Sequence, residues 1–134
     1  MNKKLIIAGG IFNLLIAIMH LALYPLLNWS HSLECLSHEN RAIMQMLNNH
    51  VALTAFIFFY ISIFHYKELL TTRLGRVMLL GISAFYFLRG IEEFIYYDIK
   101  EIFSGFYFLG FITFFSFGII YLIPFIKSST GNRE

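Results

Sequence analysis

The stretch LIIAGGIFNLLIAIMHLALYPLL, residues 5–27, decides the fold of this chain. It contains no Asp, Glu, Lys or Arg, and it exceeds the roughly 20 apolar residues that a helix needs to cross a bilayer. Hydrocarbon cannot pair exposed backbone N–H and C=O groups, whereas a helix pairs them within itself. We therefore predict a transmembrane helix over residues 5–27.

Three further stretches are long and mainly apolar: residues 47–66, 74–97 and 104–126, of which only 74–97 contains Asp, Glu, Lys or Arg. They lack the alternation of a membrane β-barrel, and the links between them are short, which favours antiparallel neighbours. The sequence predicts an all-α fold, a four-transmembrane-helix antiparallel bundle forming one domain over residues 1–127, with a disordered cytoplasmic tail over 128–134. Expected helix caps are Ser37, Thr71 or Thr72, and Ser104.

Composition agrees with a membrane location. Hydrophobic residues make up 58% of the chain and charged residues 13%, against roughly 25% charged residues in soluble domains. So few charged residues cannot cover the surface of a small water-soluble protein. We therefore expect the lipid bilayer to be the main partner. The net charge of +2 and the lack of a long basic run argue against a nucleic-acid partner.

The distribution of Lys and Arg predicts the orientation, because cytoplasmic loops carry the excess of these residues. Seven lie on one side and two, Arg41 and Lys100, on the other; the seven are Lys3, Lys4, Lys67, Arg73, Arg76, Lys127 and Arg133. We expect both termini in the cytoplasm and, for a bacterial source, a multi-pass protein of the inner membrane. The first segment is too long for a cleaved signal peptide and lacks a small-residue cleavage site.

Ionisable side chains within the spans are the main functional signal. They are costly in hydrocarbon, usually face the bundle interior and often mark functional sites. The predicted catalytic residues are His20, Arg89, Glu92 and Glu93, and the predicted ligand-binding residues are Asn13, Tyr24, Asn49, His50 and Tyr96. At about 1.5 Å per residue, most of these lie in the outer half of the bilayer, so we expect one pocket there.

Several functions are compatible with such a set. The pocket would bind a small ligand, ion or substrate, with Arg89 holding an anionic or carbonyl group and a Glu carrying protons. Alternatives are a small proton-coupled transporter, as a homodimer, or an accessory subunit that meets a membrane-protein partner. A purely structural role is also open, in which Arg89 neutralises one Glu at i,i+3 or i,i+4 and fixes helix register.

Two cofactor hypotheses follow from the histidines. His31, Cys35 and His38 would share one face if their segment were helical, and imidazole and thiolate are ligands of zinc and copper. His20 and His50 on separate helices could ligate one haem. The alternatives are an ordinary polar loop and interfacial histidines.

The loop residues Trp29, Leu33, Leu36, Ser37, Asn40, Arg41, Ile43 and Met44, together with Arg89, carry a resemblance. They resemble small four-helix bacterial inner-membrane proteins, a group for which the resemblance implies the fold and no activity. The chain is also similar in size to the small multidrug transporters, but its first span has no Glu where theirs carry the essential one.

Overall fold

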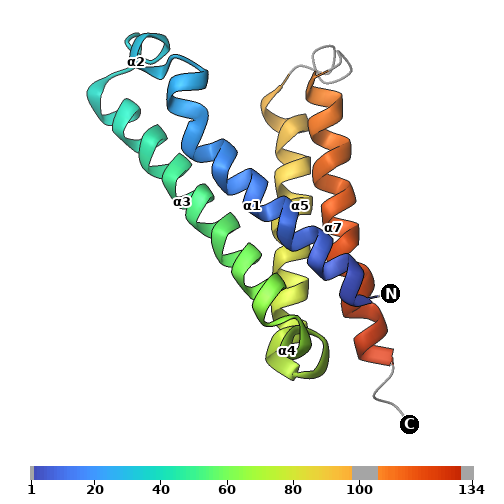
Figure 1. The fold of residues 1–134 in the computed structure, drawn as a ribbon. Coiled ribbons are helices and arrows are strands. Elements are labelled where there is room, and N and C mark those ends of the chain that lie inside the picture. Colours follow the sequence, from blue (N-terminus) through green and yellow to red (C-terminus); the bar gives the residue numbers. More distant parts are fainter. Residues whose placement is uncertain (1, 98–105, 131–134) are drawn as a thin grey trace. The chain divides into compact units, whose positions relative to one another are not determined.

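The computed structural model of the chain describes residues 2–97 and 106–130, and within these ranges all regular structure is helical. Four helices are long, and two short ones, α2 (Trp29–Ser32) and α4 (Tyr66–Thr71), lie in the connections (Figure 1). The long helices are α1 (Asn2–Leu26), α3 (His38–Phe64), α5 (Arg73–Tyr96) and α7 (Phe106–Thr130). The predicted all-α fold with four membrane-spanning helices is confirmed.

The long helices expose apolar side chains. Their 24 to 27 residues extend for about 36–40 Å at about 1.5 Å per residue. Leu21, Leu53 and Leu74 are 67%, 57% and 72% exposed, and similar residues are exposed on every long helix. A water-soluble bundle would turn such side chains inward and present charged ones. The chain is therefore a multi-pass membrane protein whose apolar side chains face lipid.

Helix ends follow the predicted caps where they can be seen. The Asn40 N–H donates to the Ser37 hydroxyl (3.3 Å), so α3 starts at His38, well before the predicted span at residue 47. The Gly75 N–H donates to the Thr72 hydroxyl (2.9 Å) and fixes the start of α5. Ser104 lies outside the described residues.

The C-terminal helix is longer than expected. Residues 128–130, predicted to belong to a disordered tail, continue α7 to Thr130. The Ser128 hydroxyl donates to the Phe125 carbonyl (3.0 Å), and the Arg76 guanidinium donates to the Ser128 carbonyl (3.5 Å). These bonds satisfy acceptors that a helix end leaves open. Residues 131–134 lie outside the described part of the chain.

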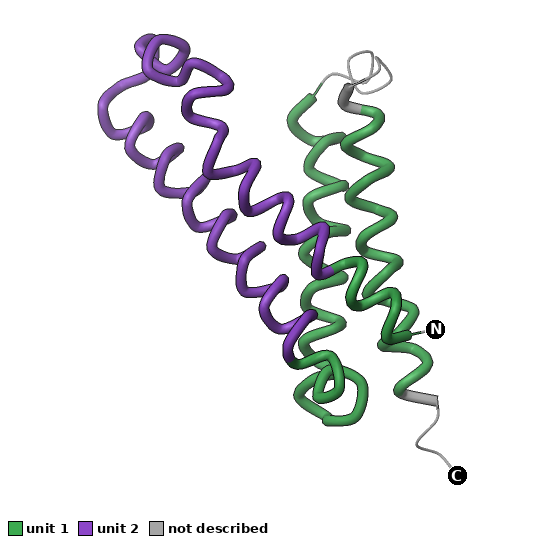
Figure 2. Tube along the Cα trace, in the orientation of Figure 1, with its two compact units in different colours: residues 1–9, 65–134 green, residues 10–64 purple. Residues whose placement is uncertain are grey.

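The chain forms two compact units (Figure 2). Unit 2 comprises residues 10–64, and unit 1 comprises residues 1–9 and 65–134. The predicted single domain over residues 1–127 stays a prediction.

In unit 2, α1 and α3 pack as an antiparallel pair. A Cβ placed on Gly10 would lie 2.9 Å from side-chain atoms of Ser62 and Ile63, so the two backbones approach closely at this end. Toward the other end, the His20 and Asn48 side chains are hydrogen-bonded. Later residues of α1 thus meet earlier residues of α3, as an antiparallel hairpin requires. Glycine permits this approach, as is common between membrane helices.

A left-handed residue turns the chain between α1 and α3. Asn28 has φ 48° and ψ 48°, the conformation that often ends helices and that Asn tolerates better than most residues. The Ser32 hydroxyl donates to the carbonyls of Leu27 (2.7 Å) and Asn28 (2.9 Å) and braces the turn. The turn brings Trp29, only 7% exposed, against the helix pair.

In unit 1, small residues allow α5 and α7 to pack closely and antiparallel. The Ser83 hydroxyl donates to the Gly118 carbonyl (2.8 Å). A Cβ on Gly90 would lie 2.5 Å from the Phe115 ring. Tyr86 and Tyr121 stack with ring centroids 6.4 Å apart at the centre of this contact. Both tyrosines are buried, so aromatic packing fills the α5–α7 interface.

A glycine pair tests the packing of α4 on α5. A Cβ on Gly75 would overlap the backbone of Glu68 and Leu69, whereas one on Gly81 would meet no described residue within 4 Å. We expect Gly75→Ala to destabilise the purified protein by about 1–3 kcal/mol, because neither backbone can yield easily. Gly81→Ala is the matched control and should be neutral or stabilising. Thermal unfolding in detergent measures both, and equal melting temperatures would contradict the described α4–α5 contact.

Candidate functional sites

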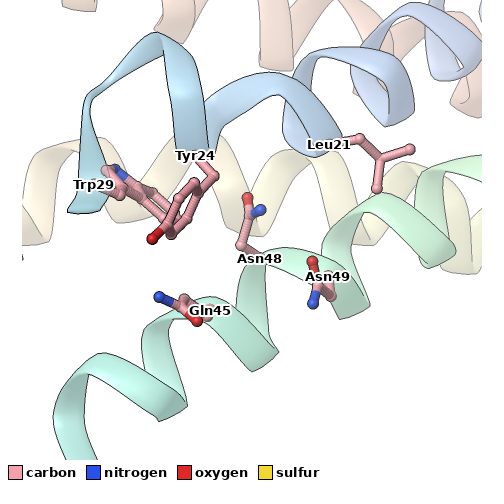
Figure 3. A pocket seen from close by; sticks show the side chains of 6 residues that line it. All are labelled: Leu21, Tyr24, Trp29, Gln45, Asn48 and Asn49. Atoms are coloured by element: carbon pink, nitrogen blue, oxygen red, sulfur yellow. The ribbon is translucent and has the colours of Figure 1, made fainter. Parts of the chain in front are cut away.

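Unit 2 contains a small polar hollow at the end of α1 and α3 that adjoins α2 (Figure 3). We call it the amide hollow, and its volume is about 200 Å³. Its lining residues are Leu21 and Tyr24 of α1, Trp29 of α2, and Gln45, Asn48 and Asn49 of α3. Typical pockets for drug-sized ligands measure roughly 300–1,000 Å³, so this hollow suits a smaller molecule.

A reciprocal contact between His20 and Asn48 holds this region together. Nδ1 of His20 lies 2.7 Å from Oδ1 of Asn48, and the Asn48 amide N–H donates to the His20 carbonyl (2.8 Å). Because the amide nitrogen is used as a donor, Oδ1 remains as the acceptor, and the hydrogen-bond network assigns the proton to Nδ1 of His20. The neutral ring then has its lone pair on Nε2.

The walls of the amide hollow are polar and carry no formal charge. Each side-chain amide has two N–H donors and one acceptor oxygen, and Asn48 already uses its oxygen and one N–H in its contacts with His20. The Tyr24 ring is 45% exposed beside the buried Trp29. Figure 3 shows the two rings side by side, facing the amide side chains of α3. The described part of this wall therefore combines hydrogen-bond donors and acceptors with aromatic rings and has no formal charge.

Sequence reasoning found part of this site. Tyr24 and Asn49 were predicted to bind a ligand, and both line the hollow. His20, a predicted catalytic residue, does not line it but is hydrogen-bonded to the lining residue Asn48. The remaining lining residues, Leu21, Trp29, Gln45 and Asn48, were not predicted. A usable signal existed, because residues 45, 48 and 49 stand at i, i+3 and i+4 and share one helix face. The prediction relied mainly on ionisable residues, so it included Asn49 but not Gln45 or Asn48.

His50 is exposed and does not line the amide hollow. Its Nδ1 lies 2.7 Å from the Met46 carbonyl, which can only accept, so Nδ1 carries the proton. The Thr54 hydroxyl donates to the His50 carbonyl (2.8 Å), so the helix supplies both contacts. The haem site of His20 and His50 stays a prediction.

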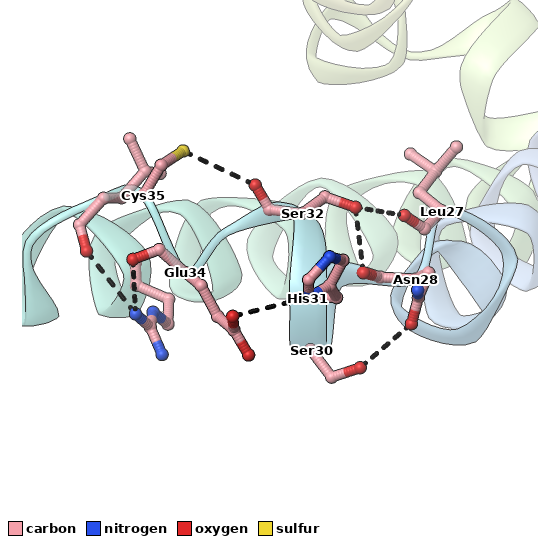
Figure 4. Close-up of polar contacts among 9 residues, drawn as sticks. Leu27, Asn28, Ser30, His31, Ser32, Glu34 and Cys35 are labelled. Carbon is pink, nitrogen blue, oxygen red and sulfur yellow. Dashed lines mark hydrogen bonds and ion pairs between the residues drawn. The ribbon is translucent and has the colours of Figure 1, made fainter.

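The loop before α3 does not form the helical face expected for a metal site (Figure 4). The helix α2 ends at Ser32 and α3 begins at His38, so His31, Cys35 and His38 are separated by turns. Nδ1 of His31 lies 3.4 Å from the Glu34 carboxylate, and the Cys35 thiol donates to the Ser32 carbonyl (3.6 Å). Within the described ranges, no three His, Cys, Asp or Glu side chains group closely enough to hold a metal ion. The condition for a shared helical face is therefore not met, and the metal site of His31, Cys35 and His38 stays a prediction.

Unit 1 contains the Arg89–Glu93 pair. Nη2 of Arg89 lies 2.8 Å from Oε1 of Glu93, whose side chain is 5% exposed, and the Arg89 guanidinium lies 4.8 Å from the centre of the Phe114 ring. Oε2 of Glu93 is also buried, and it has no hydrogen-bond partner in the described part of the chain. A buried polar atom left unpaired costs about 1–3 kcal/mol, and more when it is charged.

The other predicted site residues differ in burial and belong to different compact units. Glu92 is partly exposed, and Arg89 pairs with Glu93 instead. Asn13 is fully buried in α1, and Tyr96 is 78% exposed at the end of α5. Unit 2 contains Asn13, the two histidines and the amide hollow, whereas unit 1 contains the Arg89 set. Convergence of both sets on one pocket stays a prediction.

Comparison with known proteins yields no matching family model, no similar curated protein and no similar solved structure.

Proposed function

We propose that this multi-pass membrane protein binds a small uncharged polar molecule in the amide hollow. The observation that carries the proposal is the convergence of three amide side chains on one face of α3 with Tyr24 and Trp29. Polar groups that converge in a concave site fix the orientation of a ligand and supply its specificity.

The chemistry of the walls defines the ligand class. Among the described residues, no Asp, Glu, Lys or Arg lines the hollow, so an ion would leave water without gaining an opposite charge there. Amide groups instead match hydroxyl, amide or carbonyl groups. The apolar surfaces of Leu21 and the two aromatic rings suit a carbon skeleton next to those groups. A polyol, a sugar ring or a small amide combines both features.

The contact of His20 with Asn48 supports this role. Asn48 is held by two hydrogen bonds to α1, so its side chain is oriented before a ligand arrives. A preoriented wall loses less conformational freedom on binding. His20 is therefore proposed as a positioning residue that acts through Asn48.

We also propose that the amide hollow opens on the outer side of a bacterial inner membrane, with both termini in the cytoplasm. Basic residues gather at the other end of α1: Nζ of Lys3 lies 4.8 Å from the centre of the Tyr66 ring of α4, beside Lys67. Arg76, at the start of α5, contacts the end of α7 next to Lys127. Lys and Arg favour the cytoplasmic side, and the amide hollow lies near the opposite end of α1.

Trp29 provides a direct test of ligand binding, because it is the single tryptophan of the chain. Its emission should change saturably when the full-length protein in detergent is titrated with at least one of glycerol, glucose, N-acetylglucosamine and acetamide. Asn48→Ala should weaken that binding by about tenfold, since a hydrogen bond contributes about 0.5–1.5 kcal/mol and the contact with His20 is also lost.

Asn40→Ala is the matched control, because Asn40 is exposed at the start of α3 and outside the amide hollow. It should bind as the wild type does. A response to acetate or ammonium alone, no response to any uncharged member, or equal affinities of the Asn40 and Asn48 variants would overturn the proposal.

Cys35 tests the orientation, because it is the single cysteine and is exposed in the loop before α3. A membrane-impermeant maleimide should label it in intact bacteria that express the protein. In the variant Cys35→Ser with Ser128→Cys, labelling should require permeabilised cells. The reverse pattern would show that the termini lie outside.

A further inference from the structure

We propose that unit 1 contains a second binding site, in which Oε2 of Glu93 accepts a hydrogen bond from an uncharged, lipid-soluble molecule with a hydroxyl or N–H group. The site lies between α5 and α7 and is independent of the amide hollow. The unpaired oxygen of a buried carboxylate is the hydrogen-bond acceptor, and phenylalanine side chains of α5 and α7 form the apolar surface of the site.

The carboxylate is held firmly through its other oxygen. Arg89 contacts Oε1 at 2.8 Å, and Phe114 supports the guanidinium at 4.8 Å. The Tyr97 N–H donates to the Glu93 backbone carbonyl (3.2 Å) at the end of α5, so the backbone of Glu93 is also fixed. Oε2, the other oxygen of this carboxylate, has no hydrogen-bond partner among the described residues. A donor can therefore bind it without breaking an existing contact.

The charges of the Arg89–Glu93 pair favour an uncharged ligand with a hydrogen-bond donor. Arg89 and Glu93 together carry no net charge, so a cation would add an uncompensated charge to an apolar region, which is costly. An anion would meet the carboxylate. A neutral O–H or N–H group gains a hydrogen bond to an ionised acceptor, which is roughly twice as strong as a bond between neutral groups.

The surroundings favour a molecule with an apolar body. Phe94 of α5 contacts Phe111 of α7, with ring centroids 4.8 Å apart, and Phe94 is 44% exposed, so this edge of the pair faces lipid. Gly110 lies opposite Glu93: among the described residues, a Cβ placed on it would approach Oε1 of Glu93 and Phe114, both at 4.0 Å. The missing side chain leaves room for a small group on the Oε1 side of the carboxylate.

The alternative occupant is water, which can satisfy a buried acceptor when the space is polar enough. The two occupants differ in one measurable respect. A lipid-soluble ligand must gain affinity from its donor group, whereas a site that takes only water will not distinguish such a ligand from its methylated analogue.

4-Fluorophenol and 4-fluoroanisole are therefore the matched probes, because they share a fluorinated ring and only the phenol has an O–H donor. Their ¹⁹F NMR signals are followed during titration of the full-length protein in detergent. We expect saturable binding of the phenol, at least about tenfold tighter than that of the anisole, because of the hydrogen bond to a charged acceptor.

The double variant Arg89→Leu with Glu93→Leu should reduce this preference to about one. Replacing a buried ion pair by apolar residues is usually tolerated or stabilising, so this variant should fold, and partition of the probes into detergent is common to all variants. Gly110→Leu should also abolish saturable phenol binding, because it fills the space beside an intact ion pair. Glu68→Gln removes an exposed carboxylate of α4 and should leave the preference unchanged.

Equal affinities of the two probes, or a phenol preference that persists in both the double variant and Gly110→Leu, would overturn the proposal. Absence of saturable phenol binding would also overturn it and leave water as the occupant. The titration of Trp29 is read separately, so failure at Glu93 is distinguishable from failure at the amide hollow.

Discussion

Hydrogen bonding without water is the constraint on which the rest of this structure depends. A helix satisfies its own backbone in hydrocarbon, but polar side chains within the spans need partners. Most find them in one of two ways. Thr54 donates to a carbonyl one turn earlier, whereas Ser83 donates to Gly118 across the α5–α7 contact. The second kind ties helices together, so polar residues that are costly in lipid also fix the packing.

The two candidate sites are places where polar side chains lie beside open space or lack a partner among the described residues. In unit 2, amide groups line a hollow whose size leaves space for a small molecule. In unit 1, one oxygen of Glu93 is paired with Arg89 and the other has no partner in the described ranges. We propose that a ligand uses hydrogen-bonding capacity that folding leaves open, and that in each site this ligand is uncharged.

Local signals in the sequence predicted local structure well. The four apolar spans, the caps at Ser37 and Thr72, and the Arg89–Glu93 pair depend on neighbours within one helix turn or on segment length, and each is found. Contacts between helices were harder. The pairing of His20 with Asn48 depends on the register of α1 against α3, which is set by close approach at Gly10 and by the turn at Asn28. No periodicity within either helix encodes that register.

An experimental structure of the protein in a lipid bilayer would test the central claim most directly, because it would show what satisfies the unused polar groups. We expect density that is not protein beside Asn48 and Trp29, and a donor from outside the protein within hydrogen-bond distance of Oε2 of Glu93. The claim would be contradicted by protein side chains that fill the amide hollow and pair both oxygens of Glu93.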